Sequence, residues 1–426
     1  MTAGPAPLFS RPADEALYRQ GRAEARERMA AAGKEARRGL LVLPRDGDPA
    51  DVGWIVAALE NSAVPLLLGS GSWAAETWRA LARHLRPALA RGPVPEDLAW
   101  AADPAPLPGE TVLVRTGGSS GVPRFARQTV PALRAAAGHL ATALGGGPLS
   151  AALLLPLWHV GGLLPVVRAR ESGGQLCRPG DPASAGELPG HRLLSIVPTH
   201  LQRALAGESP AELVARATLL FAGGAAFPAA PLAEARARGW PLAPVYGQTE
   251  TAGMIALQRP ESFREAGVPR LEALPGNRIT LGEDGEIRVV SDQLFAGYLG
   301  APAPGGEGWG TGDRGRWDER GRLEILGRLG RFLQSGGETV SLEHVEQTAA
   351  TLPGVGEAVA VARPDPAWGE RVWLAVGVGE SGMTAAEVAA QLRSRLDPAE
   401  RPARIAVHPE LPRTAAGKVD SDRLFP

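Results

Sequence analysis

Residues 111–129 read TVLVRTGGSSGVPRFARQT: an apolar segment, a glycine- and serine-rich loop, and a segment of alternating polarity. The apolar segment Thr111–Arg115 predicts a buried strand. Backbone N–H groups beside glycines, together with the hydroxyl groups of Thr116, Ser119 and Ser120, suit an array of phosphate oxygens. No Gly-Lys-Ser/Thr sequence follows, so this is not a Walker loop. The stretch therefore indicates a strand and loop of an α/β domain, in which the loop either binds phosphate or only connects two elements.

The same loop also matches GxSxG, the nucleophile elbow of α/β-hydrolases, with Ser119 as the nucleophile. An elbow requires a helix directly after the serine, and Pro131 would interrupt a helix that begins at Pro123. Arg124–Thr129 alternates in the manner of a strand instead. The histidines considered for a triad are His191, His200, His344 and His408, and the sequence singles out none of them. A serine hydrolase is therefore the second interpretation of this loop.

Outside this stretch, short apolar segments alternate with amphipathic ones. The predicted strands are 40–43, 64–68, 151–157, 193–197 and 219–221, and the predicted helices include 14–38, 130–144 and 228–238. Such alternation is typical of an α/β fold with buried, largely parallel strands. Turn signals at 284–285 and 319–321 predict hairpins. After Arg328, Ser341 and the capping box Thr384–Glu387 predict the helices of a small α+β domain.

Composition excludes several classes of protein. The formal net charge of −1 lacks the basic excess of a nucleic-acid-binding protein. The single cysteine, Cys177, excludes an intramolecular disulfide and a zinc site with several cysteines. No apolar segment reaches the roughly 18 residues that cross a bilayer, so we expect a cytoplasmic protein without membrane insertion. Of 45 basic residues only Lys34 and Lys418 are lysines, which singles both out in an arginine-rich chain.

Further segments, together with the loop, resemble the adenylate-forming superfamily of acyl-CoA synthetases, luciferases and peptide-synthetase adenylation domains. They are FAGGAAFP (221–228), VYGQTETAG (245–253), GWGTGDRG (308–315), GRLGRFLQSGGETVSLEHVE (327–346) and PRTAAGKVD (412–420). The resemblance covers roughly residues 111–426. It implies an α/β fold with a large layered N-terminal domain, residues 1–328, whose first subdomain is reduced. A small mobile α+β domain, residues 329–426, would carry the catalytic lysine.

The resemblance implies ATP, Mg²⁺ and coenzyme A as the molecules bound. Lys418 would bridge the substrate carboxylate and the α-phosphate, and Thr249 would bind that phosphate. Glu250 would ligate Mg²⁺, a cation that prefers oxygen ligands. The other implied binding residues form the following set: Thr116, Ser119, Ser120, Gly121 and Arg124 for the β- and γ-phosphates, Gly224, Ala225, Tyr246 and Gly247 for adenine, Asp313 with Arg328 for ribose, and Gly336 and Gly337 for the pantetheine arm.

LPLWHVGGL (155–163) and SIVPTHLQRAL (195–205) resemble one branch in particular, the o-succinylbenzoate–CoA ligases of menaquinone and phylloquinone synthesis. This implies o-succinylbenzoate as the small-molecule substrate, with another aryl or short acyl carboxylate as the alternative. His159 would lie at the acyl pocket, although a histidine after an apolar strand equally fits a core position. Thr199 and His200 are candidate donors to the second carboxylate. A homodimer is a further expectation.

Two positions depart from the superfamily pattern. Arg124 replaces the usual lysine of the phosphate loop, and guanidinium also binds phosphate. Gly330 stands where the hinge before the C-terminal domain usually has Asp or Lys, and glycine permits a wide backbone rotation there. A third interpretation is a relative that binds ATP or AMP without catalysis, and the retained Glu250 and Lys418 speak against it.

Overall fold

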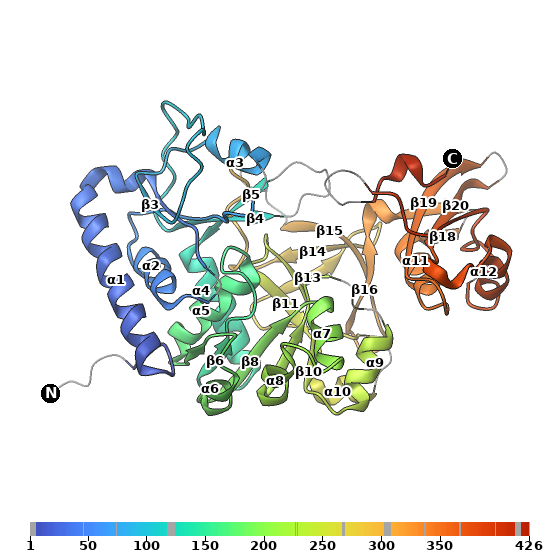
Figure 1. Cartoon of the computed structure of the whole chain (residues 1–426), viewed down its shortest axis with the longest axis horizontal. Coiled ribbons are helices and arrows are strands. Elements are labelled where there is room, and N and C mark those ends of the chain that lie inside the picture. The colour runs from blue at the N-terminus through green and yellow to red at the C-terminus, as the bar shows by residue number, and fades with distance from the viewer. Residues whose placement is uncertain are drawn as a thin grey trace. The chain divides into compact units, whose positions relative to one another are not determined.

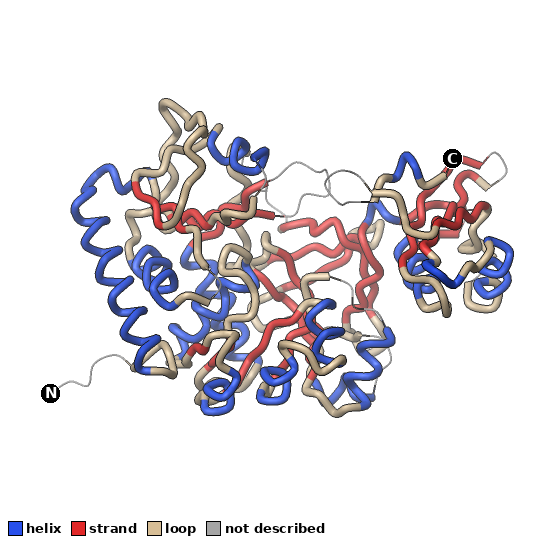
Figure 2. Tube along the Cα trace, viewed as in Figure 1, coloured by secondary structure: helices blue, strands red, loops and turns tan. Residues whose placement is uncertain are grey.

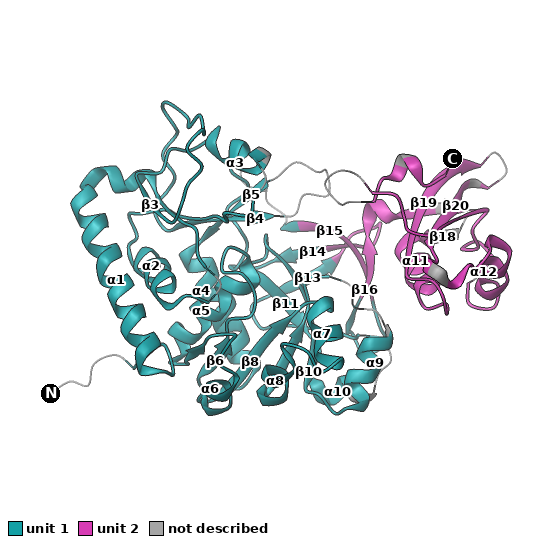
Figure 3. Cartoon of the chain, in the orientation of Figure 1, with its two compact units in different colours: residues 1–280, 288–309, 317–324 teal, residues 281–287, 310–316, 325–426 magenta. Residues whose placement is uncertain are grey.

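The computed structural model describes residues 6–45, 47–73, 75–116, 124–225, 227, 229–265, 269–301, 308–335, 338–365, 368–396, 398–413 and 419–425. These residues form an α/β fold, which confirms the predicted class. The contacts divide the chain into two compact units, shown in Figure 3. Unit 1 comprises residues 1–280, 288–309 and 317–324, and unit 2 comprises 281–287, 310–316 and 325–426. The domain boundary at 328/329 stays a prediction.

The first sheet of unit 1 holds the predicted phosphate loop between its last two strands. Its order is β3 (Leu89–Arg91), β1 (Leu40–Val42), β2 (Leu66–Leu68), β4 (Thr111–Thr116) and β5 (Arg124–Thr129). The pairs among β1 to β4 are parallel, and β5 runs antiparallel to β4 (Figure 1). Helices α1 (Pro12–Ala32) and α2 (Pro49–Glu60) pack on each other beside it. The next described element after the loop is therefore a strand and not the helix that a nucleophile elbow requires.

The second sheet of unit 1 has seven strands, with helices on its two faces (Figure 2). Its order is β12 (Glu272–Ala273), β11 (Gly253–Leu257), β10 (Leu242–Gln248), β9 (Leu219–Ala222), β8 (His191–Ile196), β6 (Leu149–Ala152) and β7 (Leu176–Cys177). The strands from β7 to β10 are parallel, whereas β11 reverses direction after β10.

Alternate residues of these parallel strands enter two different cores. Phe221 packs in the core shared with α4 (Val130–Ala143) and α5 (Val160–Ser172). Leu220 and Ala222 pack in the core shared with α7 (Pro198–Leu205) and its neighbours, which are α6 (Pro182–Glu187), α8 (Ala211–Arg216) and α9 (Ala229–Ala237). Because successive side chains point to opposite faces of a sheet, strands buried on both faces are apolar throughout. This explains why these strands are continuous apolar segments in the sequence.

Two predicted elements were wrong in their bounds. The strand predicted at 151–157 is β6, Leu149–Ala152, and residues 153–157 form a loop that leads to α5. At the start of α5, a Cβ at Gly162 would lie 2.1 Å from the carbonyl oxygen of Pro156, so the helix packs closely against this loop. The helix predicted at 14–38 ends at Ala32, because Gly33 has a φ of +52° and a 3₁₀ helix (Gly33–Arg38) follows. No described helix is long and apolar enough to span a membrane.

A further sheet has the order β13 (Arg278–Leu281), β14 (Glu286–Val290), β15 (Trp309–Trp317) and β16 (Leu323–Arg328), and the division between the units passes through it. The predicted turns at 284–285 and 319–321 lie between its strands, which confirms both hairpins. The last sheet belongs to unit 2 and contains β18 (Glu338–Ser341), β17 (Phe332–Ser335), β20 (Gly369–Gly377), β19 (Glu357–Asp365) and β21 (Arg404–His408).

Two helices cover the sheet of unit 2 and begin where the sequence predicted. The Ser341 hydroxyl accepts a hydrogen bond from the His344 N–H at the start of α11 (Leu342–Ala350). Thr384 and Glu387 form the predicted capping box of α12 (Ala385–Leu392). A cap supplies partners to backbone N–H groups that a helix leaves unpaired at its start. The α+β character predicted for this part of the chain is therefore confirmed.

Candidate nucleotide and acyl site

The turn between β10 and β11 carries Thr249 and Glu250 and is held by a network of buried polar groups. The Thr251 hydroxyl accepts from the Gln248 N–H at 2.9 Å and lies 2.7 Å from the carbonyl oxygen of Gly253. Gln293, which is fully buried, donates from Nε2 to the Thr251 carbonyl at 2.6 Å. Ala252 adopts a left-handed φ of +45°, a strained conformation for a residue with a Cβ. These contacts fix the backbone of the turn, and they thereby orient its two predicted site residues, Thr249 and Glu250.

Gly247 allows β10 and β11 to approach each other directly before this turn. A Cβ at this position would lie 2.0 Å from the carbonyl oxygen of Gly253, which is backbone and cannot rotate away. The strand register also shifts between Tyr246 and Gly247. Glycine is therefore required here for close packing of two backbones, and the predicted adenine-binding role of this segment depends on that packing.

Glu250 is a buried carboxylate whose position is set by hydrogen bonds. Its side chain is 8% exposed, and Oε1 accepts a hydrogen bond from the Tyr298 hydroxyl at 2.6 Å. Its backbone carbonyl accepts from the Phe295 N–H at 2.9 Å. Among the described residues no Arg, Lys or His forms an ion pair with it. A buried carboxylate of this kind, whose hydrogen-bond donor is a neutral phenol, fits a divalent cation as its charged partner.

The single carboxylate of Glu250 is compatible with Mg²⁺. No cluster of three or more His, Cys, Asp or Glu side chains forms a metal site within the described ranges. A cation at Glu250 would therefore take most of its ligands from phosphate oxygens and water. Mg²⁺ is bound in this way, through one or two carboxylates plus substrate phosphates.

Arg124, which follows the predicted phosphate loop, is linked to Glu250 through Tyr298. Segment 296–299 pairs with β5, because the Ala296 N–H donates to the Arg127 carbonyl at 2.7 Å and the Leu299 N–H to the Phe125 carbonyl at 2.8 Å. The segment carries Tyr298, and the guanidinium carbon of Arg124 lies 4.3 Å from the centre of that ring. The structure therefore brings together Arg124, which follows the loop, and Glu250.

One further contact ties β5 to the turn. Gln128 of β5 is fully buried and donates from Nε2 to the Thr249 carbonyl. Thr116 ends β4, directly opposite Arg124, and its buried hydroxyl has no hydrogen-bond partner within the part of the chain that is described. A buried hydroxyl that lacks a partner is a candidate donor to a ligand oxygen. Ser119, Ser120 and Gly121 lie outside the described residues.

The predicted adenine-binding residues come together at one edge of the seven-stranded sheet. β9 and β10 are parallel neighbours, with Ala222 opposite Pro244. Gly224 and Ala225 follow β9, whereas Tyr246 lies near the end of β10, so they share the carboxyl edge of these strands. Ligands bind at this edge in open α/β sheets. Gly224 has a φ of +81° and is exposed, and Tyr246 is buried.

His159 lies beside an aromatic cluster and not in an apolar core. Its ring centre is 3.8 Å from that of Trp158, and Trp158 meets Trp73 edge-on at 5.9 Å. Part of the imidazole is exposed. Burial of the remainder lowers the pKa of His159 below its ordinary value, and the charge of Arg115 lowers it further. The imidazole is therefore neutral at pH 7 and can donate or accept one hydrogen bond.

Thr199 and His200 lie in the first turn of α7, which follows β8. Thr199 is exposed, and His200 is half-buried with no described hydrogen-bond partner for Nδ1. Burial and then the charge of Arg203 lower the pKa of His200. Both residues lie directly after β8, at the carboxyl edge of the seven-stranded sheet. This position is compatible with the predicted role at an acyl group.

In unit 2, Asp313 and Arg328 form an ion pair. The Arg328 Nε lies 3.0 Å from Asp313 Oδ1, and Arg328 Nη1 donates to the Thr311 carbonyl at 3.0 Å. Asp313 is 8% exposed. The pair joins the two residues predicted to lie at the ribose. Lys418, Gly336 and Gly337 lie outside the described residues.

Some residues of the site were not predicted from the sequence. Gln128 is one of them, and a buried glutamine within an alternating strand is a signal that could have singled it out. Tyr298 is another, because a single tyrosine within FAGYLG (295–300) indicates no role by itself. Trp309, whose Nε1 donates to Gln248 Oε1 at 3.4 Å, carries no signal of its own in the sequence.

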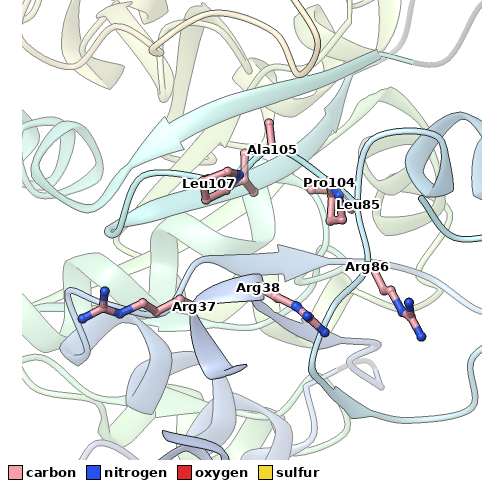
Figure 4. Close-up of a pocket in the computed structure, with 8 residues that line it drawn as sticks. Arg37, Arg38, Leu85, Arg86, Pro104, Ala105 and Leu107 are labelled. Carbon is pink, nitrogen blue, oxygen red and sulfur yellow. The ribbon is translucent and has the colours of Figure 1, made fainter. Parts of the chain in front are cut away.

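Other residues line a hollow of about 170 Å³, which Figure 4 shows in close-up. It is lined by Arg37, Arg38, Leu85, Arg86 and residues 104–107. None of the predicted site residues contributes to it. Arg38 is paired with Glu35 at 2.9 Å, and the three arginines are exposed. We assign no part of the proposed chemistry to this hollow.

Comparison with known proteins gives matches over most of the chain. Residues 57–299 match the family described as AMP-binding enzyme, and residues 344–418 match the AMP-binding enzyme C-terminal domain. A protein of Mycobacterium tuberculosis named probable 2-succinylbenzoate–CoA ligase is 32% identical over 333 residues, which cover 74% of this chain and 83% of that protein. A 4-chlorobenzoate–CoA ligase of an Arthrobacter species is 33% identical over 53% of this chain and 47% of its own length.

Solved structures share the fold. The o-succinylbenzoate coenzyme A synthetase of Bacillus subtilis, in complex with its acyl-adenylate intermediate, matches with a TM-score of 0.74 and 21% identity over 93% of this chain and 92% of that chain. An ATP-bound protein from Rhodopseudomonas palustris matches with a TM-score of 0.73 and 21% identity over 96% and 92% of the two chains. These likenesses confirm the large and small parts of the adenylate-forming fold.

Proposed function

Because this chain belongs to the AMP-binding enzyme family, we propose that it is an ATP-dependent acid–thiol ligase that converts o-succinylbenzoate to its coenzyme A thioester. The observation that carries the proposal is the buried Glu250, held by Tyr298 beside Arg124. A carboxylate and a guanidinium, joined through Tyr298, would then serve a divalent cation and the triphosphate that it accompanies. Thr116, with its unpartnered hydroxyl, adds a donor to the same place.

The reaction has two steps. In the first, a carboxylate oxygen of the substrate attacks the α-phosphorus of ATP, the bond from phosphorus to the bridging oxygen breaks, and pyrophosphate leaves. Two anions must approach each other, so charge neutralisation and positioning supply most of the catalysis. Arg124 and Thr116 would hold the leaving phosphates, Glu250 would hold the cation, and Thr249 and Lys418 would contact the α-phosphate. Mg²⁺, when bound, supplies positive charge to the phosphate oxygens.

In the second step the thiol of coenzyme A loses its proton to solvent, its sulfur attacks the acyl carbon, and the bond from that carbon to the phosphate oxygen breaks, so that AMP leaves. We place the acyl group near His159 and the first turn of α7, and the pantetheine arm near Gly336 and Gly337. The neutral imidazole of His159 can hydrogen-bond a carbonyl or carboxylate without adding charge. The thioester would serve menaquinone or phylloquinone synthesis in the cytoplasm, where ATP and coenzyme A are available.

The choice of o-succinylbenzoate rests on the relatives, several of which carry that name. A ligase for another aryl carboxylate is the alternative, favoured by the 4-chlorobenzoate–CoA ligase among the same relatives. A serine hydrolase that uses Ser119 is not favoured, since the next described element is β5, a strand antiparallel to β4.

Product analysis tests the proposal. The enzyme is incubated with ATP, Mg²⁺ and coenzyme A plus o-succinylbenzoate, 4-chlorobenzoate, benzoate or a fatty acid, and thioesters and AMP are measured by mass spectrometry. We expect equal amounts of AMP and o-succinylbenzoyl-CoA, at a rate above that with the other acids. A thioester formed only from another acid would keep the ligase and reject the substrate. No thioester from any acid, together with ester hydrolysis lost in Ser119→Ala, would reject the ligase.

A further inference from the structure

We propose that Tyr298 is a positioning residue that holds the Glu250 carboxylate in the orientation needed to bind the divalent cation. This inference rests on the proposed function and adds to it a residue for which the sequence indicated no role. The contact that carries it is the hydrogen bond of 2.6 Å from the Tyr298 hydroxyl to Glu250 Oε1. A short hydrogen bond from a phenol to a carboxylate is charge-assisted and strongly directional.

The hydrogen bond distinguishes the two oxygens of Glu250. Oε1 accepts the phenol proton, and no described residue donates to Oε2. Glu250 would therefore offer a cation a carboxylate that cannot rotate freely. The backbone of Glu250 is fixed as well, because its carbonyl accepts from the Phe295 N–H at 2.9 Å. The side-chain torsions of Glu250 are then the remaining freedom, and the hydrogen bond from Tyr298 restrains them.

Tyr298 itself is held firmly enough to act in this way. Ala126 and Tyr298 form an antiparallel bridge, which joins the tyrosine backbone to β5. Its ring meets Phe295 at 5.0 Å and Trp309 at 6.1 Å, both edge-on. Arg124 covers the ring with its guanidinium carbon 4.3 Å from the centre. The arrangement couples the cation ligand to the arginine that follows the phosphate loop through one aromatic ring.

Partners that orient a metal ligand are often as important to affinity as the ligand is, and their loss typically costs about 10- to 100-fold in metal affinity. Tyr298→Phe removes one oxygen atom and leaves the ring, its aromatic neighbours and Arg124 in place. If the hydroxyl positions Glu250, cation binding weakens. If the tyrosine only anchors segment 296–299 on β5, the phenylalanine preserves cation binding.

The test measures binding of Mn²⁺, a paramagnetic substitute for Mg²⁺, by electron paramagnetic resonance. The full-length enzyme is saturated with α,β-methylene-ATP, which cannot release pyrophosphate. We expect Tyr298→Phe to weaken Mn²⁺ binding about 10-fold. Tyr18→Phe is the matched control, because Tyr18 of α1 is buried against Phe9 and lies far along the chain from the site. We expect this variant to bind Mn²⁺ as the wild type does.

Glu250→Gln provides a second test. In that background the hydroxyl has no carboxylate to orient, so we expect Tyr298→Phe to cause no further loss of Mn²⁺ binding. Equal Mn²⁺ binding by the wild type and Tyr298→Phe would overturn the inference while leaving the ligase intact. An equal loss with and without Glu250 would also overturn it, because the tyrosine would then act on the fold. A wild type that binds no Mn²⁺–nucleotide would reject the proposed function and this inference with it.

In the adenylation assay, excess Mg²⁺ distinguishes weaker cation binding by Tyr298→Phe from a disturbed fold. We expect a raised Mg²⁺ concentration to restore the rate of Tyr298→Phe nearly to that of the wild type. A rate that stays low at saturating Mg²⁺ would contradict a role in cation binding.

Discussion

The Nε atom of Arg328 lies 3.0 Å from Oδ1 of Asp313, in a pair whose carboxylate is buried and whose guanidinium also reaches the Thr311 carbonyl. The arginine fixes one oxygen of Asp313 and so orients the carboxylate. An oriented carboxylate is suited to accept hydrogen bonds from the two hydroxyl groups of a ribose. The pair therefore supports the predicted nucleotide role of Asp313 in unit 2.

Asp313→Asn should weaken ATP binding. Hydrogen bonds to a charged acceptor contribute about 1.5–3 kcal/mol, so we expect the dissociation constant, measured by calorimetry, to rise roughly 10- to 100-fold. Asp318→Asn is the control, because Asp318 also pairs with an arginine, Arg322 at 2.8 Å, but is not a predicted site residue. If Asp313 only holds Arg328, both variants will bind ATP as the wild type does.

Gly247→Ala should disturb the nucleotide turn. The added Cβ would lie 2.0 Å from the Gly253 carbonyl oxygen, so β10 and β11 must separate. We expect a loss of about 1–3 kcal/mol in the free energy of unfolding, the usual range for overpacking, together with weaker ATP binding. Gly138→Ala in α4 is the matched substitution, since no atom lies within 4 Å of its added Cβ. It should stabilise the helix by about 0.5–1 kcal/mol, and equal effects of the two changes would refute the steric argument.

The lowered pKa of His159 has a defined pH dependence. Burial and Arg115 disfavour the imidazolium in the folded protein, so the unfolded chain binds this proton more readily. The folded state therefore loses stability as the pH falls below about 6.5, the ordinary value for histidine. An NMR titration should place the midpoint of His159 below that value, and Arg115→Gln should move it upward. A wild-type midpoint at or above 6.5 would contradict this environment.

Cys177 should be unreactive in the folded protein. Its side chain is 1% exposed, and burial, with smaller contributions from Asp181 and Asp14, raises the pKa of the thiol to about 12. The thiolate is the reactive form, so a disulfide reagent should label no thiol at pH 8 until denaturant is added. Because Cys177 is the only cysteine of the chain, any labelling reports on this residue. Rapid labelling of the native enzyme would show that β7 opens.

The fold was largely predictable because its signals are local. Apolar runs such as Thr111–Arg115 mark strands buried on both faces, and capping residues such as Thr384 mark the start of helices. Element ends were less predictable where packing decides them. The run 151–157 is apolar throughout, yet the chain leaves the sheet after Ala152 because it must turn into α5.

The predicted site residues that the structure describes lie in the loops and strand ends where motifs placed them, but their mutual contacts could not be predicted. The hydrogen bond between Tyr298 and Glu250 joins residues 48 positions apart, and that from Gln128 to the Thr249 carbonyl joins residues 121 apart. Such contacts depend on how two sheets meet. A motif indicates which chemical groups are present and cannot indicate which of them position one another.

The central claim is that this chain adenylates o-succinylbenzoate with Lys418, and pyrophosphate release tests it most directly. The chain has only two lysines, so Lys34→Ala, at an exposed residue of the 3₁₀ helix after α1, is a matched control for Lys418→Ala. With ATP, Mg²⁺ and o-succinylbenzoate we expect Lys34→Ala to release pyrophosphate at the wild-type rate. Lys418→Ala should lose roughly 100- to 1,000-fold, as expected for removal of a group that stabilises transition-state charge. Release at the wild-type rate by Lys418→Ala, or no release by the wild type, would contradict the account.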